Sequence, residues 1–259
     1  MVKAGASHKE DILSTDQNFW ANYDPSGAVT VKAELIRKRI PEGVRSIADI
    51  GAGNGIITNL LSKDFDVTAV DISEEALQFV TTKKILASAT ELPFEDNSYD
   101  LVMSNQMLEH LPSLDLHRAI REMKRVSRRY LLISVPHKEQ LVAENVKCPK
   151  CLRIFNAYGH IQSFHRKRLL NLFSGYNVLA EDLLGQPVRD YPQSLLKIRQ
   201  SLGGQWYQGD FPGGCPQCGN TEFPPSANLI TKSCNLISRL VTCERPYWIM
   251  LLLEMNTST

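Results

Sequence analysis

Three glycines stand at alternate positions in one short segment, and their spacing could bring a ligand against the main chain. Gly51, Gly53 and Gly55 follow the apolar segment 46–50 and precede a helical pattern that ends near Ser62. Glycine permits positive φ angles and lets a ligand contact the backbone. The amino end of the next helix adds oriented N–H groups and partial positive charge. The segment therefore predicts close contact between main chain and ligand.

A carboxylate follows the next strand at the distance expected of a group that binds a sugar. Asp71 lies about 20 residues after Gly51, and an acid there can accept hydrogen bonds from both hydroxyls of a ribose. The dinucleotide pattern G-x-G-x-x-G fails at Ile56, and no Gly-Lys-Ser/Thr of a phosphate loop follows. The combination predicts a nucleoside ligand across the first two strand ends. The alternative is a tight strand–helix turn in an unrelated α/β fold.

Two cysteine pairs carry the spacing of metal ligands. C-P-K-C supplies Cys148 and Cys151, and C-P-Q-C, a turn like a zinc knuckle, supplies Cys215 and Cys218. Two intervening residues let both thiolates of a pair point at one ion, and four thiolates form a closed tetrahedral zinc site. The sequence predicts one structural zinc shared by both pairs. The alternatives are two unconnected thiol pairs or a redox C-x-x-C, and the latter is disfavoured because neither pair opens a helix in a thioredoxin-like unit.

The other cysteines and two loop histidines are weaker candidates. Cys234 and Cys243 lack this spacing and are expected to be small buried residues. His160 and His165 could replace a zinc ligand or line a pocket.

Strand-length apolar segments alternate with helical patterns along much of the chain. The expected strands cover residues 46–50, 66–72, 84–89, 99–105, 130–136, 176–184 and 245–256. The expected helices cover 29–40, the segment from the glycines to about 62, 73–83, 114–126 and 163–173. This alternation predicts a doubly wound, seven-stranded, mostly parallel sheet with helices on both faces. Ligands then bind outside the carboxyl ends of the strands.

Composition narrows the classes of protein and partner. The chain has 259 residues and a formal net charge of +1, so there is no bulk electrostatic case for nucleic acid or an anionic membrane. It has no apolar run of membrane-spanning length, and its first residues lack the apolar core of a signal peptide. Six cysteines in a chain expected to be cytoplasmic favour metal binding over disulfides.

A resemblance to a known family rests on several motifs in order. DIGAGNG, then AVDIS, then ASATELPFEDNSYDLVMSNQMLEHL resemble the class I S-adenosylmethionine (SAM)-dependent methyltransferases, most closely the small-molecule type related to quinone biosynthesis. The resemblance covers about residues 20–136, with a weaker match over 163–184 and the last strand. It implies a Rossmann-like methyltransferase fold, SAM as cofactor and a small-molecule acceptor.

The resemblance also assigns roles to individual residues. It implies that Asp49 and Asn105 orient the methionyl amine, that Asp71 binds the ribose, and that Ile72 packs against adenine. Family members often have Asp before the alanine beside the adenine edge, where this chain has Ser88. The remaining cofactor residues implied by the resemblance are Tyr23 in the covering helix, Gly51, Ala52, Gly53 and Gly55 in the turn, and Ala89 and Thr90 beside the adenine edge.

Two histidines are placed where a base could act on the acceptor. His110 follows the fourth strand and His137 follows the fifth, so both are expected at the carboxyl edge. Imidazole accepts a proton near neutral pH, which a hydroxyl acceptor requires. The alternative for each is a structural loop histidine. Glu109 is expected to pack or to form hydrogen bonds.

The chain is expected to consist of a core with two insertions. We expect an N-terminal cap segment at 1–28, a SAM-binding core at 29–147, a first zinc-binding insertion at 148–162, the core continued at 163–184, a second insertion with the zinc knuckle at 185–243 and a final core strand at 244–259. Both insertions leave the carboxyl edge, so a shared zinc would join them as a lid over the acceptor pocket.

Two other classes of function stay open on the sequence. An RNA or protein methyltransferase could use the zinc module to hold its substrate, although the near-neutral charge argues against RNA. A non-catalytic partner with a SAM fold is the third possibility, which the intact glycine segment and Asp71 argue against. Two basic runs, 124–129 and 166–168, are expected to be solvated or to contact an acidic acceptor.

Overall fold

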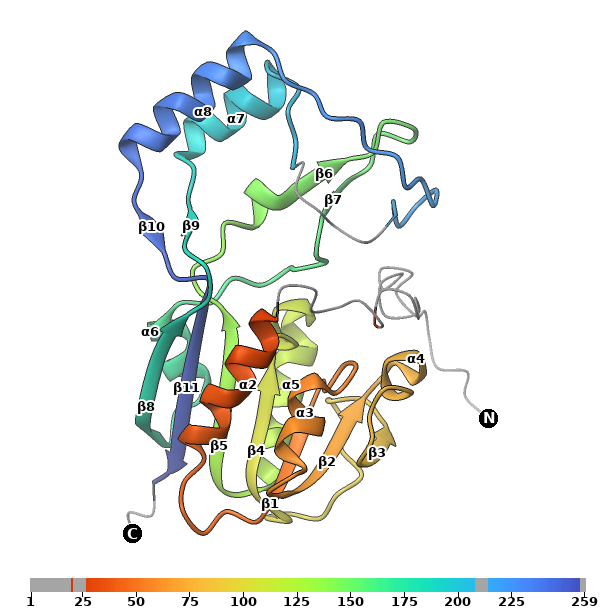
Figure 1. Ribbon diagram of the computed structural model, residues 1–259, viewed down its shortest axis with the longest axis vertical. Coiled ribbons are helices and arrows are strands. Elements are labelled where there is room, and N and C mark those ends of the chain that lie inside the picture. Colours follow the sequence, from red (N-terminus) through yellow and green to blue (C-terminus); the bar gives the residue numbers. More distant parts are fainter. Residues whose placement is uncertain (1–19, 21–26, 208–213, 257–259) are drawn as a thin grey trace.

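Seven strands form one central sheet in the order β3-β2-β1-β4-β5-β11-β8. The computed structural model describes Trp20, residues 27–207 and residues 214–256 (Figure 1). The strands are β1 (Ser46–Ile50), β2 (Asp66–Asp71), β3 (Lys83–Leu86), β4 (Tyr99–Asn105), β5 (Ser127–Pro136), β8 (Tyr176–Leu184) and β11 (Trp248–Met255).

Parallel pairing dominates this sheet. β1 pairs in parallel with both β2 and β4, β2 with β3, and β4 with β5. β11 is antiparallel to β5 and to β8. The chain reverses its direction of winding at β1, so the carboxyl ends of β1 and β4 border the crevice in which such sheets bind ligands. The doubly wound, mostly parallel sheet expected from the sequence is confirmed, with strand ends that differ by a few residues.

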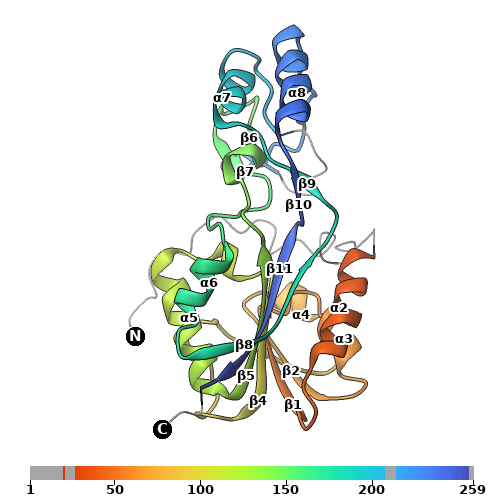
Figure 2. The same ribbon diagram turned by 90° about the vertical axis from the view of Figure 1, so that its left-hand side faces the viewer.

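Helices cover both faces of the sheet, as the edge-on view in Figure 2 shows. α2 (Ala28–Arg39) and α3 (Ile56–Leu61) pack on one face, in a core that includes Ile36 and Leu61. α5 (Ser113–Val126) and α6 (Arg166–Leu172) pack on the other face. Leu116, Ile120 and Met123 recur at helical spacing on α5, which explains why this helix was predictable from its apolar periodicity.

The helix expected over residues 73–83 is wrong in length, because α4 covers only Glu74–Leu77. The next residues are held in place by the side chain of Asn59 on α3. Its Nδ2 donates to Phe79 O at 2.9 Å, and its Oδ1 accepts from Thr81 N–H at 2.8 Å. These tertiary hydrogen bonds replace helical ones in a segment rich in β-branched residues, which are weak helix formers.

The two insertions form a smaller unit beyond the carboxyl ends of the parallel strands (Figure 1). A hairpin of β6 and β7, a second strand pair of β9 and β10, and two helices compose it. The bounds are β6 (Asn145–Lys147), β7 (Ile154–Asn156), β9 (Val188–Arg189), β10 (Glu244–Arg245), α7 (Gln193–Ser201) and α8 (Leu229–Val241), with 3₁₀ turns η1 (Leu108–His110) after β4 and η2 (Leu141–Glu144) before β6.

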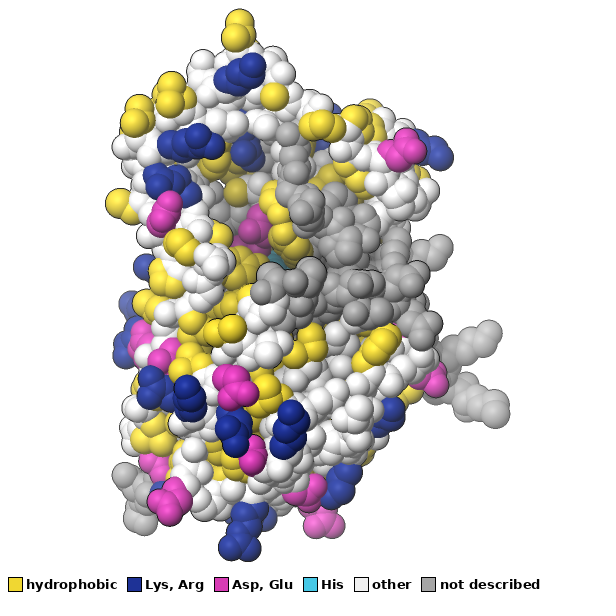
Figure 3. Space-filling view, in the orientation of Figure 1, with side chains coloured by type: hydrophobic (Ala, Val, Ile, Leu, Met, Phe, Trp, Pro, Cys, Tyr) yellow, Lys and Arg dark blue, Asp and Glu magenta, His cyan; other side chains and the backbone are white. Residues whose placement is uncertain are grey.

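Helices α7 and α8 were not anticipated in the long second insertion. A local signal for α8 is present, because Asn228 and Thr231 form a reciprocal capping box at its amino end. The helix also exposes apolar side chains, including Leu236 and Leu240. Figure 3 shows hydrophobic side chains scattered over this end of the molecule. Within the described residues, no helix combines the length and hydrophobicity that crossing a membrane requires.

The packing of α5 yields a direct test of the fold. Leu116 is fully buried in the core on this face, whereas Leu114 on the same helix is 63% exposed. We expect Leu116→Ala to lower the free energy of unfolding by about 2–5 kcal/mol, because it removes buried methyl groups and leaves a cavity. Leu114→Ala is the matched control, with an expected change within about 0.5 kcal/mol. Urea unfolding measures the free energy of unfolding of both variants. Equal losses in the two variants would contradict this arrangement of α5.

Candidate functional site

The glycine segment forms a turn that is tied to the neighbouring strand. The N–H groups of Gly51 and Ala52 both donate to the carbonyl of Val70, at 2.8 and 3.1 Å. Gly51 has φ +76°, Gly53 +55° and Gly55 +74°, all in the left-handed region that disfavours other residues. The positive φ angles expected from the sequence are therefore present, and Gly55 caps the start of α3.

Side chains lie close to these glycines. A methyl group added to Gly51 would lie 2.4 Å from Met107 Cγ, and one added to Gly53 would lie 2.9 Å from the ring of Trp20. The close approach inferred from the glycines is real, but in this structure it is made by protein side chains. A ligand on this stretch of main chain requires Met107 and Trp20 to move, which is easiest for the flexible methionine.

The carboxylate of Asp71 is fixed by the backbone at the end of β2. One oxygen accepts from Gly53 N–H and the other from Ser73 N–H, both at 2.8 Å. Asp71 thus links the glycine turn to the following loop.

Polar atoms without partners gather at the carboxyl ends of β1 and β4. Asp49 is buried; its Oδ2 accepts from Thr58 Oγ1 at 2.6 Å, but its Oδ1 has no partner among the described residues. Both side-chain atoms of Asn105 are likewise buried and unpartnered within the described chain. Buried polar atoms are nearly always hydrogen-bonded, so these orphaned atoms mark a place where a polar ligand fits.

Burial also controls the charges near this point. It raises the pKa of Asp49 to about 7, against the hydrogen bond from Thr58. Lys32 on α2 is buried as well, with its Nζ 4.5 Å from the centre of the Trp248 ring. Burial lowers the pKa of Lys32 to about 7, although the carboxylates of Glu109 and Asp49 act to raise it. The burial of Lys32 was not predictable from its neighbours in the chain, since a lysine on a surface helix is ordinarily exposed.

The expected adenine contacts lie beside β2 and after β3. The side chain of Ile72 is 70% exposed and hence accessible to a ligand. Ser88, which replaces the expected acid, shares a hydrogen bond with the hydroxyl of Thr90 at 2.8 Å. Ala89 between them packs partly against the core. Tyr23 lies outside the described residues.

The two candidate bases occupy different surroundings. His137 is buried. Its backbone N–H donates to Tyr247 O at 2.8 Å, and its ring Nδ1 has no partner within the described residues. Burial lowers the pKa of His137, and the charges of Lys138 and Arg245 lower it further, which favours the neutral imidazole. His110 is half-buried and lies instead against a second histidine.

That second histidine, His160, belongs to a polar group missed by the sequence reasoning. Its ring centre lies 4.8 Å from that of His110, and its Nδ1 lies 2.7 Å from an oxygen of Glu139. Glu109 is buried near them, but neither of its carboxylate oxygens has a partner among the described residues. Of the two expectations for Glu109, packing is confirmed by its burial, whereas its carboxylate makes no hydrogen bond within the described residues. No periodicity or spacing in the sequence connects residue 109 with 139 and 160.

The four paired cysteines converge, as the sequence predicts. Their sulfur atoms all lie within 4.8 Å of one another, with Cys148 Sγ 3.6 Å from Cys218 Sγ and Cys151 Sγ 3.4 Å from Cys215 Sγ. Burial acts to raise the pKa of Cys148, but N–H groups of Cys151 and Lys150 and the neighbouring thiols lower it to about 6. This is the donor set of a closed zinc site.

The other cysteine and histidine candidates have separate places. Cys234 is buried as expected, but Cys243 is exposed, so the expectation of burial is wrong there. His160 and His165 do not join the four sulfurs. The ring of His165 accepts from Arg168 N–H and caps α6, and His160 pairs with Glu139.

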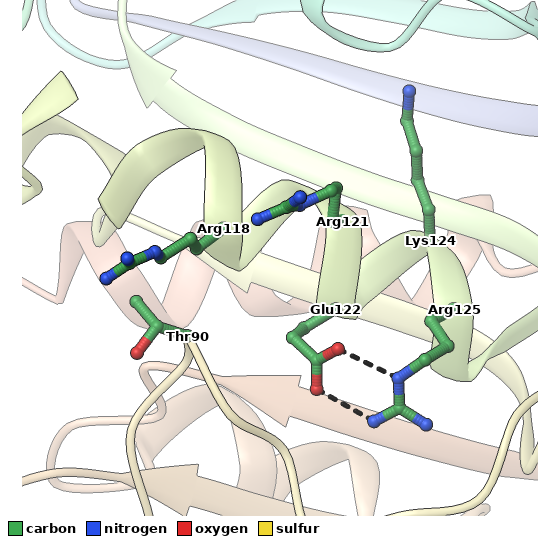
Figure 4. A pocket seen from close by; sticks show the side chains of 6 residues that line it. All are labelled: Thr90, Arg118, Arg121, Glu122, Lys124 and Arg125. Carbon is green, nitrogen blue, oxygen red and sulfur yellow. Dashed lines mark hydrogen bonds and ion pairs between the residues drawn. The ribbon is translucent and has the colours of Figure 1, made fainter. Parts of the chain in front are cut away.

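The first basic run is engaged within the fold. Arg125 pairs with Glu122 at 2.7 Å, and Lys124 Nζ donates to the carbonyls of Leu172 and Ser174. Figure 4 shows the surface hollow of about 590 Å³ beside these residues. It lies along α5 and touches the candidate site only through Thr90. Its lining is Thr90, Arg118, Arg121, Glu122, Lys124 and Arg125.

Part of the chain matches known methyltransferases. Residues 48–130 match the family model described as a methyltransferase domain. The chain is similar to an uncharacterized protein of Methanocaldococcus jannaschii, at 36% identity over 39% of this chain and 44% of that one. It is also similar to a demethylmenaquinone methyltransferase of Staphylococcus aureus, at 32% identity over 46% of this chain and 57% of that one. These matches span about half the length of the relatives.

A solved structure extends the likeness over nearly the whole chain. The structure of a SAM-dependent methyltransferase from Archaeoglobus fulgidus superposes with a TM-score of 0.57 at 19% identity, covering 92% of this chain and all of that one. At this identity the likeness concerns the fold. The chain therefore has the Rossmann-like fold of the class I SAM-dependent methyltransferases, and its residues 48–130 match a methyltransferase domain.

Proposed function

We propose that this chain transfers the methyl group of SAM to a small-molecule acceptor. The observation that carries the proposal is the edge formed by β1, β2 and β4, where Asp71 is fixed on Gly53 N–H beside the unpartnered atoms of Asp49 and Asn105. The methyltransferase-domain match covers these strands. The similarity to a methyltransferase that acts on demethylmenaquinone, by its name, supports a small acceptor.

The proposed cofactor contacts follow the edge of the sheet. Asp71 accepts hydrogen bonds from the ribose hydroxyls, and Ile72 packs against the adenine. Asp49 and Asn105 hold the methionyl amine, whose N–H groups donate to the unpartnered oxygens Asp49 Oδ1 and Asn105 Oδ1. The turn of Gly51, Ala52, Gly53 and Gly55 supplies the main chain under the methionyl part, and Ala89 and Thr90 border the adenine.

Methyl transfer requires that the acceptor atom be aligned with the methyl group, and some acceptors also require a base. SAM supplies, when bound, a methyl group on a sulfonium that is transferred by in-line displacement. The protein aligns the acceptor and keeps water away from it. His137, whose burial lowers its pKa and whose Nδ1 is unpartnered among the described residues, is a base that could take a proton from an acceptor hydroxyl. His110 is the second candidate for this role.

We also propose that the four cysteines bind one structural zinc ion. Cys148 and Cys151 belong to the first insertion, and Cys215 and Cys218 to the second, so one ion joins both insertions. Four thiolates fill the coordination sphere and leave no open position, so the role is to hold the lid rather than to react. Cysteines kept as thiolates suit a reducing compartment such as the cytoplasm.

The ribose assignment is tested at Asp71. We expect Asp71→Ala to weaken SAM binding by about 1.5–3 kcal/mol, the scale of hydrogen bonds to a charged group. Calorimetric titration with SAM measures this. Glu74→Gln, which changes an exposed acid at the start of α4, is the matched control and should bind as the wild type does. Unchanged affinity in Asp71→Ala would remove the assignment, and no saturable SAM binding by the wild type would leave a non-catalytic role.

The buried carboxyl group of Asp49 is expected to lower the stability of the fold at high pH while it contributes to SAM binding. Its pKa is raised from 3.8 to about 7 on folding, so it holds its proton more tightly in the folded chain. Its stabilising contribution is complete below the unfolded pKa and is lost as the pH rises through about 7. When the pH rises from 5 to 8, we expect the free energy of unfolding of the wild type to fall by on the order of 3 kcal/mol more than that of Asp49→Asn.

Urea unfolding without SAM at the two pH values measures this difference. Asp66→Asn, at the exposed start of β2, is the control and should keep the wild-type pH dependence. We expect Asp49→Asn to bind SAM more weakly although it is more stable at pH 8. Parallel pH profiles in wild type and Asp49→Asn would show that this carboxyl group is not perturbed by folding.

The zinc proposal is tested by removing one thiol. We expect Cys215→Ser to lose its bound zinc and to lower the melting temperature by several degrees, because three ligands hold the ion less tightly. Cys243→Ser removes an exposed thiol outside the cluster and should keep full zinc content. Elemental analysis of the purified proteins checks both. A wild type without zinc would refute the proposal.

A further inference from the structure

A second group of metal-ligand side chains lies where the first insertion returns to the core. The carbonyl of Glu109, in η1, accepts hydrogen bonds from the N–H groups of Ile161 and Gln162 at 2.9 and 3.0 Å. These bonds dock the segment after β7 onto the turn after β4. They bring His160 beside Glu109 and His110, although 50 residues separate the two histidines.

The three side chains present ligand atoms to one another. Glu109, His110 and His160 each have one such atom within 4.8 Å of the other two. Glu109 has an exposed fraction of 0%, and both its carboxylate oxygens lack a hydrogen-bond partner in the described chain. A buried carboxylate in this condition is costly, and a bound cation would compensate it.

His160 already has the support that metal-binding histidines usually have. Its Nδ1 lies 2.7 and 2.8 Å from the two oxygens of Glu139, which is also buried. Its backbone N–H donates to Asn156 Oδ1 at 3.1 Å, which fixes the loop. A carboxylate on one ring nitrogen sets the tautomer and leaves the other nitrogen to bind a metal. Glu139 therefore has the place of an outer support rather than a ligand.

We propose that Glu109, His110 and His160 form a binding site for a divalent transition-metal cation, separate from the four-cysteine site. Two imidazoles and one carboxylate suit zinc, iron or manganese, and three protein ligands leave open coordination positions. Figure 3 shows acidic and histidine side chains in the hollow between the sheet and the smaller unit.

The open positions give this site a role distinct from that of the cysteines. A cation there can bind an oxygen, nitrogen or sulfur atom of the acceptor and favour its deprotonated form. This consequence rests on the proposed methyl transfer, whereas the binding of the cation does not. The hairpin of β6 and β7 connects the two sites, since Cys148 and Cys151 lie at its turn and His160 follows its second strand.

Metal binding by the whole chain tests the site with Co²⁺ as the probe. We expect the wild type to bind Co²⁺ at two sites. The ion at the cysteines should show thiolate charge-transfer absorption, and the ion at the second site should not. Glu109→Gln and His160→Ala should each lose only the Co²⁺ ion that lacks charge-transfer absorption. Cys215→Ser should lose the charge-transfer absorption and keep the other. Glu139→Gln should weaken the second site about 10–100-fold, the usual effect of losing an outer support.

Controls separate loss of the site from loss of the fold. His117→Ala removes an exposed histidine of α5 and should leave Co²⁺ bound at both sites. Glu109→Gln keeps the side-chain shape, and SAM affinity measured on the same variant reports whether the core is intact. If the wild type binds only the thiolate-coordinated ion, or if Glu109→Gln and His160→Ala keep the full Co²⁺ content, the proposal is overturned.

Discussion

Parallel pairing of β1 with both β2 and β4 is the constraint on which the site depends. This pairing brings the ends of three strands to one edge, and with them Asp49, Asp71 and Asn105. Each strand is buried on both faces, so its end is the first place where a polar group can reach a ligand. The hydrogen bond from Gly53 N–H to Asp71 then joins the first two loops into one structure.

The same edge carries groups that oppose folding. Asp49 and Lys32 are buried with pKa values displaced toward 7, and Glu109 is buried without a side-chain partner among the described residues. A chain selected for stability alone would replace such groups by apolar ones. Their presence at the ligand edge fits a site whose binding partner completes the hydrogen bonds that folding leaves open.

The insertions are joined to the core by two kinds of contact. The cysteines gather at the outer end of the β6–β7 hairpin, while hydrogen bonds from Ile161 and Gln162 to Glu109 hold its base against η1. A metal ion at the cysteines would fix the outer contact, since the apolar clusters formed by the described residues lie in the core and not at the cysteines. The position of His160 depends on both contacts, since it lies between them along the chain.

Local pattern alone determined the central sheet, the glycine turn, Asp71 at its strand end and the two cysteine pairs. Each of these has a signal within a few residues, such as apolar alternation, a glycine spacing or C-x-x-C. Only the tertiary structure decided the early end of α4, the burial of Lys32 and the meeting of Glu109, His110 and His160. These follow from contacts between segments far apart in the sequence, such as Asn59 with Thr81 or Glu109 with Ile161, and such contacts leave no period or spacing in the chain.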